Sequence, residues 1–179
     1  MELRFVAPDL RRLDELTSEV LACGVFADER PPHGTAGLID WRLAGCICRL
    51  MQRRFVTGSA GELVMVAVRR KLPFDKALLF GMGERAAFGE STFRSIVTRM
   101  LEVMEGLCAR SIVVELPGRH TASIAAEHAA GVLLELAEGR PEHDVWTLIE
   151  PGEDQRRVMA RLIEQRRRDR RVVLVDTKK

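Results

Sequence analysis

The hydrophobic pattern of the chain alternates between short apolar runs and longer segments with helical spacing. Residues 77–80 form a short apolar run that Gly81 and Gly83 end, which is typical of a buried strand leaving a sheet through a tight turn. In residues 91–108 the apolar positions recur every three or four residues, as on one face of a helix. This strand, glycine turn and helix form half of a βαβ unit and indicate an α/β fold.

The same two patterns recur along the rest of the chain. Apolar runs predict further strands at residues 3–6, 19–26, 63–68, 111–116, 144–149 and 172–175. Helical spacing predicts helices at residues 9–16, 40–55, 121–136 and 153–168, with Asp40 and Thr121 as N-caps. Because strands alternate with helices, the chain is expected to form a mixed, mostly parallel sheet with helices on both faces.

The length and composition describe one ordinary globular domain. A chain of 179 residues can bury one substantial core, so we expect a single domain over residues 1–179. No apolar run approaches the ~20 residues of a membrane helix, and the N-terminus lacks the pattern of a signal peptide. Four cysteines lie in apolar stretches, as reduced core cysteines do: Cys23, Cys46, Cys48 and Cys108. We therefore expect a cytoplasmic protein that does not associate with membranes.

The net charge of +2 is unevenly distributed. Residues 156–179 contain ten Lys or Arg and three Asp or Glu, a local balance of +7, whereas the rest of the chain has a balance of −5. A basic helix and strand from about residue 153 would therefore follow a mildly acidic body. Five arginines of this segment could contact the phosphates of nucleic acid: Arg166, Arg167, Arg168, Arg170 and Arg171. Because no aromatic residue lies among them, a solvated helix end is the favoured interpretation.

Three loops are candidates for a ligand site. In open α/β sheets ligands bind outside the carboxyl ends of the strands, and the predicted strands lead into the loops 81–83, 117–120 and 151–152. If these strands are parallel, the loops share one edge. A site there would include Gly81, Met82, Gly83, Gly118, Arg119 and His120. The backbone N–H groups of residues 81–83 could face a phosphate, but the sequence matches neither GxGxxG nor a P-loop, so a tight strand exit is the favoured interpretation.

Arg119 and His120 could bind an anion or transfer protons. The sequence shows no carboxylate or nucleophile partner for His120, so the role of an ordinary surface loop residue is favoured. No other His or Cys spacing fits a metal or redox motif, including that of His33, His128, His143 and the Cys46-x-Cys48 pair. We therefore expect no catalytic residue, no metal and no cofactor.

Three stretches of the sequence point to a family. They are residues 20–28 (Val-Leu-Ala-Cys-Gly-Val-Phe-Ala-Asp), residues 78–83 (Leu-Leu-Phe-Gly-Met-Gly) and the pair Phe93 and Arg94. In these stretches the chain resembles the N-terminal, non-catalytic domain of leucyl aminopeptidases, over roughly residues 19–136. The resemblance implies a macro-domain-like fold.

The resemblance also implies a function. The two metal ions and the catalytic lysine and arginine of that family lie in a C-terminal domain, whose signature Asn-Thr-Asp-Ala-Glu-Gly-Arg-Leu is absent from this sequence. We therefore expect a stand-alone relative without peptidase activity that acts in assembly, as a homo-oligomer or with a protein partner. Two alternatives stay open: a macro-like module that binds ADP-ribose, with Asp28 as the candidate acid for adenine, and a DNA-binding accessory domain.

Overall fold

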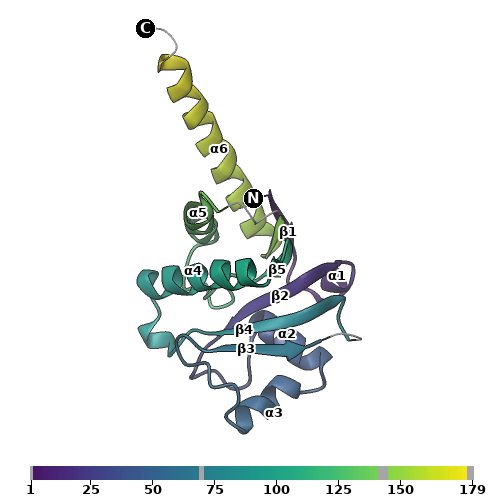
Figure 1. Ribbon diagram of the computed structural model, residues 1–179. Helices are drawn as coiled ribbons and strands as arrows, with labels where there is room; N and C mark the ends of the chain where they lie inside the picture. Colours follow the sequence, from purple (N-terminus) through teal and green to yellow (C-terminus); the bar gives the residue numbers. More distant parts are fainter. Residues whose placement is uncertain (1, 69–70, 141–144, 177–179) are drawn as a thin grey trace.

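The computed structural model describes residues 2–68, 71–140 and 145–176, and the side chains of the last helix as far as residue 164. A six-stranded sheet in the order β1-β6-β5-β2-β4-β3 forms the centre of the molecule. All neighbouring strands are parallel except β3 and β4, which are antiparallel. Helices cover both faces of the sheet (Figure 1). The predicted fold class is confirmed.

Apart from residues 40–55 and 172–175, the strands and helices follow one another along the chain as the hydrophobic pattern predicts. The strands are β1 (Glu2–Val6), β2 (Ser18–Val25), β3 (Leu63–Ala67), β4 (Phe74–Gly81), β5 (Ser111–Val114) and β6 (Val145–Ile149). The helices are α1 (Leu10–Asp14), α2 (Gly34–Arg42), α3 (Cys46–Gln52), α4 (Glu90–Gly106), α5 (Ala126–Ala137) and α6 (Gly152–Asp176), with a short 3-10 turn η1 (Arg85–Ala87). Residue 144, where we predicted a strand to begin, lies outside the described residues.

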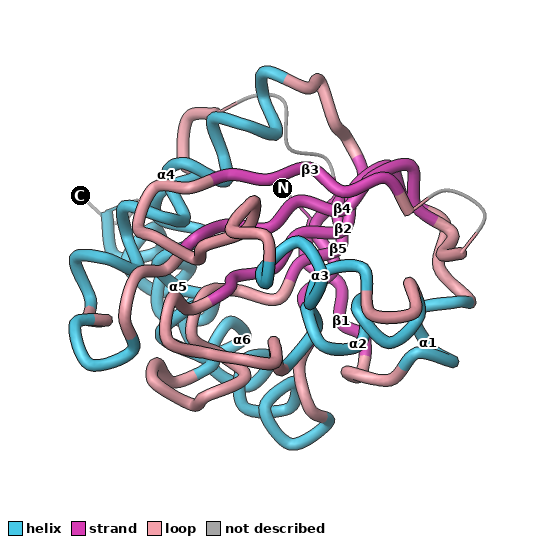
Figure 2. The backbone as a smooth tube through the Cα atoms, turned by 90° about the horizontal axis from the view of Figure 1, so that it is seen from below, coloured by secondary structure: helices cyan, strands magenta, loops and turns pink. Residues whose placement is uncertain are grey.

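The sheet separates two hydrophobic cores. Side chains of a strand alternate between its two faces, so in β4 Leu78 and Phe80 pack under α4 and α5 while Leu79 packs under α2 and α3. The central strand β2 is apolar on both faces because helices cover both sides of it. Seen from below, α2 and α3 lie in front of the sheet (Figure 2). None of the described helices is long and apolar enough to cross a membrane.

The prediction of one helix over residues 40–55 is wrong, because the chain forms two helices with a break at residues 43–45. Ala44 and Gly45 have φ angles of 52° and 77°, in the left-handed region, so a right-handed helix cannot continue through them. Asp40 lies inside α2, and its carboxylate accepts the N–H of Cys48 in the first turn of α3 (3.0 Å). Asp40 was predicted to cap the N-terminus of the helix that it begins. Instead it accepts a hydrogen bond from a free N–H group at the N-terminus of the next helix, α3.

Two other predictions about helix ends are wrong. Thr121 does not begin α5, which starts at Ala126; its hydroxyl donates to the carbonyl of Gly118 (3.0 Å) and closes the turn after β5. Residues 172–175 continue α6 and do not form a strand. The reason is that no Gly or Pro interrupts residues 153–176. The distal part of α6 extends away from the sheet (Figure 1).

The break between α2 and α3 gives a stability prediction. Ala44 is exposed and occupies a left-handed position, where an L-residue costs about 1 kcal/mol that glycine does not. We expect Ala44→Gly to raise the free energy of unfolding by about 0.5–1 kcal/mol in urea denaturation. As the matched control, Ala60→Gly at another exposed loop position should leave stability unchanged or lower it slightly. A destabilising Ala44→Gly would contradict this explanation of the break.

Candidate functional site

The candidate site lies where the parallel strands end. Because β4, β2, β5 and β6 run in the same direction, their exit loops share one edge of the sheet, which we call the strand-exit edge. The loops after β4, β5 and β6 were predicted to meet there, and the parallel pairing confirms that arrangement. The loop after β2, residues 26–33, joins them and carries residues that the sequence analysis did not select.

Three buried ionisable side chains meet at this edge. Glu29 comes from the loop after β2, Glu115 from the end of β5 and His120 from the loop after β5. His120 Nε2 lies 3.1 Å from Glu29 Oε2, and His120 Nδ1 lies 3.6 Å from Glu115 Oε2. Each of the three side chains is at most 6% exposed. The expectation that His120 is an unpartnered surface residue is therefore wrong, because two carboxylates face its two ring nitrogens.

The positions of the two carboxylates determine where the protons lie. An ionised carboxylate only accepts hydrogen bonds, so a hydrogen bond to ionised Glu29 requires an N–H on Nε2 of His120. In neutral imidazole Nδ1 would then be an acceptor, facing an oxygen of Glu115. These two acceptors would repel each other. A second proton, on Nδ1 of His120 or on the carboxyl of Glu115, removes this repulsion.

Burial favours a proton on Glu115. It raises the pKa of Glu115, and the charge of His120 and the hydrogen bond from Thr35 oppose this only in part. The backbone N–H of Thr35 lies 3.3 and 3.2 Å from the two carboxylate oxygens of Glu115. Next to it, Gly34 has a φ of 55°, and a Cβ there would lie 2.6 Å from Cβ of His120. Only glycine lets α2 begin this close to the cluster.

The cluster continues to the surface through Glu29. Its Oε1 lies 2.8 Å from Nδ1 of His33, which is largely exposed, and 3.4 Å from a guanidinium nitrogen of Arg85. Glu29 therefore connects the loop after β2 to the first turn of the loop after β4 and to the buried His120. One carboxylate ties three segments of the edge together.

Two phenylalanine rings close the edge beside this cluster. Phe26 and Phe88 pack edge to face with ring centroids 5.4 Å apart, and Phe26 lies 5.7 Å from the ring of His120. The Arg85 guanidinium lies over the ring of Phe26. Phe88 also packs on Gly118, where a Cβ would lie only 2.5 Å from Cε1 of that ring. The space above Gly118 is therefore filled by the side chain of Phe88.

Arg119 is buried and fully engaged within the protein. Its guanidinium donates two hydrogen bonds to Glu150 (2.8 and 2.9 Å) and one to Asp154 (2.8 Å), and also contacts the carbonyl of Ile124. Burial alone would lower the pKa of Arg119, but the hydrogen bonds and charges of Glu150 and Asp154 outweigh it and raise the pKa. The residue predicted to contact an anion thus joins the loop after β5 to the start of α6.

The glycine turn after β4 has its N–H groups occupied as well. The backbone N–H groups of Gly81, Met82 and Gly83 donate to carbonyls of Glu62, Val25 and Gly58, at 2.8, 2.9 and 2.8 Å. The side chain of Met82 is buried. A phosphate could reach these N–H groups only if those bonds were broken. The geometry supports a tight strand exit, the interpretation favoured from the sequence.

Two other predicted features have different outcomes. Asp28, the candidate acid for adenine, accepts the backbone N–H of Arg85 (3.1 Å) and so braces two loops. The side chains of the arginines at 166–171 lie outside the described residues, so DNA contact through them stays a prediction. Within the described parts of the chain, no group of three His, Cys, Asp or Glu side chains could hold a metal ion.

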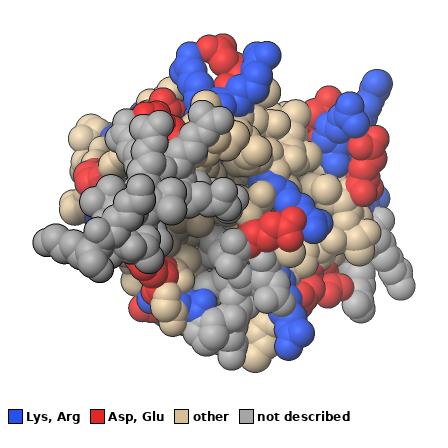
Figure 3. Space-filling model, turned by 90° about the horizontal axis from the view of Figure 1, so that it is seen from above, with Lys and Arg blue, Asp and Glu red and all other residues tan. Residues whose placement is uncertain are grey.

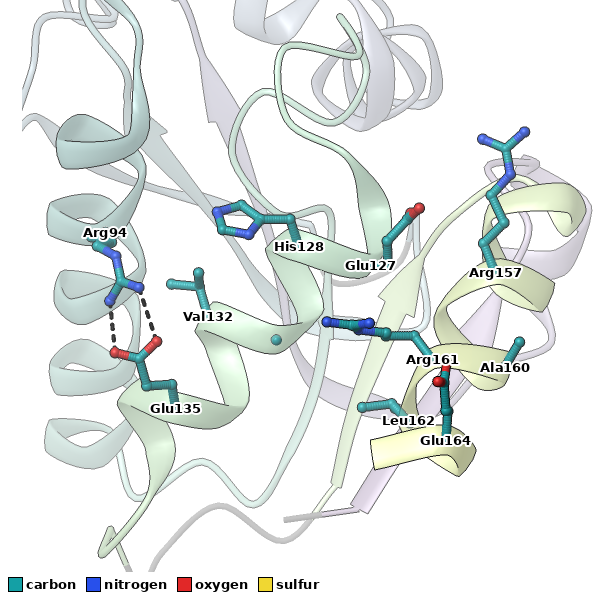
Figure 4. A pocket seen from close by; sticks show the side chains of 11 residues that line it. Arg94, Glu127, His128, Val132, Glu135, Arg157, Ala160, Arg161, Leu162 and Glu164 are labelled. Atoms are coloured by element: carbon teal, nitrogen blue, oxygen red, sulfur yellow. Dashed lines mark hydrogen bonds and ion pairs between the residues drawn. The ribbon is translucent and has the colours of Figure 1, made fainter. Parts of the chain in front are cut away.

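A groove of about 580 Å³ lies away from the edge, between α4, α5 and α6. Arg94 and Glu135 pair across its side (Figure 4), and this contact lowers the pKa of Glu135. Arg161 points from α6 toward α5 (Figure 4). Acidic and basic side chains also lie next to each other on the face seen from above (Figure 3). Charges of both signs line this groove, so it favours no single class of ligand.

A second groove, of about 650 Å³, lies between the β3–β4 end of the sheet and α4. Several hydroxyl side chains of α4, including Ser91 and Ser95, line it together with Gly61 and Gly81. Neither groove contains a residue of the buried Glu29, Glu115 and His120 cluster.

The fold is similar to that of macrodomains. The Oceanobacillus iheyensis macrodomain with ADP superposes with a TM-score of 0.69 at 14% identity, over 93% of this chain and 92% of that chain. A mutant of tomato leucine aminopeptidase superposes with a TM-score of 0.62 at 13% identity, over 90% of this chain and 35% of that chain.

Sequence comparison shows the family. Residues 22–139 match the model of the cytosol aminopeptidase family, N-terminal domain, and the chain belongs to this family. A probable cytosol aminopeptidase of Synechocystis is 28% identical over 120 residues, which are 66% of this chain and 24% of that protein. The chain thus spans about a quarter of the length of this relative. The resemblance drawn from the sequence is confirmed.

Four residues of the edge were not predicted as site residues from the sequence. Glu29 and Phe88 lie in loops, where no periodicity distinguishes them, and Phe26 was predicted only as the end of the strand over residues 19–26. Glu115 carried a usable signal, because a charged residue ends the apolar stretch Ser-Ile-Val-Val-Glu-Leu of a buried strand. A buried carboxylate requires a partner, so Glu115 could have been selected as a candidate site residue.

The packing of Phe88 on Gly118 gives a matched pair of glycine substitutions. Gly118 and Gly61 both have positive φ, 72° and 84°, but nothing lies within 4 Å of a Cβ at Gly61. We expect Gly61→Ala to cost about 1 kcal/mol for the backbone, and Gly118→Ala about 2–4 kcal/mol because it also displaces Phe88. Chemical denaturation of the two variants checks this. Equal costs would show that Phe88 does not fill the edge.

The raised pKa of Glu115 gives a pH prediction. The folded state keeps a proton that the unfolded chain releases near the usual carboxyl pKa, so the contribution of Glu115 to stability falls as pH rises above that value. Glu115→Gln removes this loss and keeps an acceptor for the N–H of Thr35. We expect the difference in melting temperature, Glu115→Gln minus the unchanged protein, to increase from pH 5 to pH 8. A constant or decreasing difference would contradict the raised pKa.

Proposed function

We propose that this domain is a non-catalytic interaction module, acting in assembly or in contact with a protein partner, and that it does not bind ADP-ribose. The observation that carries the proposal is the filled strand-exit edge. Phe88 packs on Gly118, Phe26 packs on Phe88, and His120 is held between two carboxylates. A diphosphate at this edge would have to displace the ring of Phe88 and would approach the carboxylates of Glu29 and Glu115.

The comparison with macrodomains sharpens this proposal. The Oceanobacillus iheyensis macrodomain is solved with ADP, so the fold can carry a nucleotide in that protein. In this chain, the N–H groups of residues 81–83 and the guanidinium of Arg119 are already bonded within the protein. Both groups that the sequence offered to a phosphate are therefore used to hold loops together. This supports a scaffold role and weakens the ligand-module alternative.

The absence of peptidase activity is also part of the proposal. The family match covers the N-terminal domain, and no group of described His, Cys, Asp or Glu side chains is arranged as a metal site. We expect the purified chain of 179 residues to release no leucine from leucine amide with zinc or manganese. Metal-dependent release by the pure chain would contradict this part. The name of the relatives, cytosol aminopeptidase, supports a cytoplasmic location.

Calorimetric titration with ADP-ribose tests the filled edge. We expect no saturable heat up to millimolar ligand, because the loss of the Phe88 packing and the approach of two phosphates to buried carboxylates both oppose binding. The ADP-bound macrodomain is the positive control. Micromolar binding that Gly118→Ala abolishes would overturn the proposal and establish the ligand-module alternative.

A further inference from the structure

The outer side of the α2–α3 pair has an unusual composition. Residues 41–61 contain four arginines and no Lys, Asp or Glu. Two aromatic side chains of this segment are exposed, Trp41 to 72% and Phe55 to 68%. We call Trp41, Arg49, Arg53, Arg54 and Phe55 the α3 surface. It lies on the face of the sheet opposite to α4 (Figure 1).

Helical geometry places these residues on the outside. Ile39, Ile47 and Met51 are buried against the sheet. Two residues further along a helix, a side chain lies on roughly the opposite side. Trp41, Arg49 and Arg53 each follow one of these buried residues by two positions and therefore point outward. The carbonyl of Ala44, which follows Trp41 by one turn, accepts a hydrogen bond from Arg49 (2.6 Å). Arg49 therefore lies beside the break between the two helices, which follows Trp41 in the chain.

The end of α3 keeps Phe55 exposed. The N–H of Phe55 donates to the carbonyl of Leu50 and that of Arg54 to Met51, the hydrogen bonds of a Schellman motif. In this motif the residue at the position of Phe55 usually packs back on the helix, and glycine usually occupies the position of Arg54, whose φ is 60°. Here the ring of Phe55 is 68% exposed, and an arginine occupies the position usual for glycine. An exposed ring and an arginine with positive φ are retained at the same turn.

Among the residues that the structure describes, no carboxylate pairs with the arginines of the α3 surface. Arg53 and Arg54 make no ion pair with the residues that the structure describes, and Arg49 bonds only to a carbonyl there. Arg42 differs, because it pairs with Asp14. The surface therefore offers free guanidinium groups beside two exposed aromatic rings.

We propose that the α3 surface is the docking surface of the interaction module and that its partner is an acidic protein segment carrying apolar side chains. This inference rests on the proposed function. The cores of protein interfaces are enriched in aromatic residues and arginine and depleted in Lys, Glu and Asp, which is the composition of this surface. Trp and Arg are also the residues that most often dominate binding energy. The partner is acidic because the surface has free positive charge and no acid to repel it.

A protein segment fits better than nucleic acid. Affinity for nucleic acid grows with the number of phosphates neutralised, and only Arg49, Arg53 and Arg54 are available for that on this surface. The surface also carries two exposed aromatic rings, those of Trp41 and Phe55. At a protein interface two buried rings with two or three charge contacts suffice for binding.

Selection from a phage-displayed library of random 12-residue peptides tests this proposal. We expect enrichment of peptides with an excess of Asp and Glu and at least one large apolar residue. Trp146 is fully buried, so a change in tryptophan emission on titration with an enriched synthetic peptide reports Trp41. No enrichment, enrichment of neutral or basic peptides, or unchanged Trp41 emission would overturn the proposal.

Three variants localise the binding. Trp41→Ala and Arg53→Glu should each lower the affinity for the enriched peptide by about tenfold or more, as the loss of a dominant interface side chain does. Arg11→Glu, which reverses another exposed arginine on α1, is the matched control and should change affinity by less than twofold. If the peptide binds but none of the substitutions weakens it, the interaction function stands and the α3 surface is the wrong site.

Titration with an oligonucleotide tests whether the α3 surface binds single-stranded nucleic acid instead. We expect a fluorescein-labelled 12-nucleotide oligo-dT to bind at least tenfold more weakly than the enriched peptide at 150 mM salt. Tighter binding of the oligonucleotide that Trp41→Ala and Arg53→Glu abolish would overturn the protein-segment proposal in favour of single-stranded nucleic acid. Neither result depends on ADP-ribose, so failure here is distinct from failure of the filled edge.

Discussion

The contact of Glu29 with His120 joins two loops that are 91 positions apart in the sequence, and the strand-exit edge depends on it. Glu115, at the other side of the imidazole, completes a buried group with two carboxylates and one histidine. Such a group is tolerated in an apolar interior only if protons and N–H donors compensate the carboxylates. The N–H of Thr35 and the raised pKa of Glu115 provide that compensation. Gly34 is required because any side chain there would meet His120.

This polar group and the neighbouring rings are the basis of the proposal that the strand-exit edge of this macrodomain-like sheet does not bind a nucleotide. In this chain Phe88 covers Gly118, and Arg119 donates hydrogen bonds to Glu150. The proposed contact with a partner then uses another surface. The outward residues of α2 and α3 are the part of the described surface where exposed aromatic rings and free arginines coincide. A filled strand-exit edge and an exposed α3 surface are both consistent with the proposed role of an interaction domain.

The sequence predicted the sheet well because buried parallel strands have a strong local pattern. Residues 77–80 and 111–116 were found from apolar runs alone. The helix over 40–55 was predicted incorrectly because left-handed Ala44 has no local signal; alanine is otherwise a strong helix former. His120 was selected, but its environment was not, since Glu29 and Glu115 reach it only through the fold. Local patterns identify which loops share an edge. Which side chains of those loops contact one another depends on the tertiary structure, and no local pattern shows it.

The state of His120 is the most direct test of a closed edge. Nitrogen-15 NMR of the histidine side chains reports the protonation of each ring nitrogen and the exchange of its proton with water. The account predicts a protonated Nε2 whose proton exchanges slowly, and a signal that millimolar ADP-ribose leaves unchanged. A ring with the tautomer mixture and fast exchange of free histidine, or a signal that shifts with ADP-ribose, would show that the edge is open and would contradict the account.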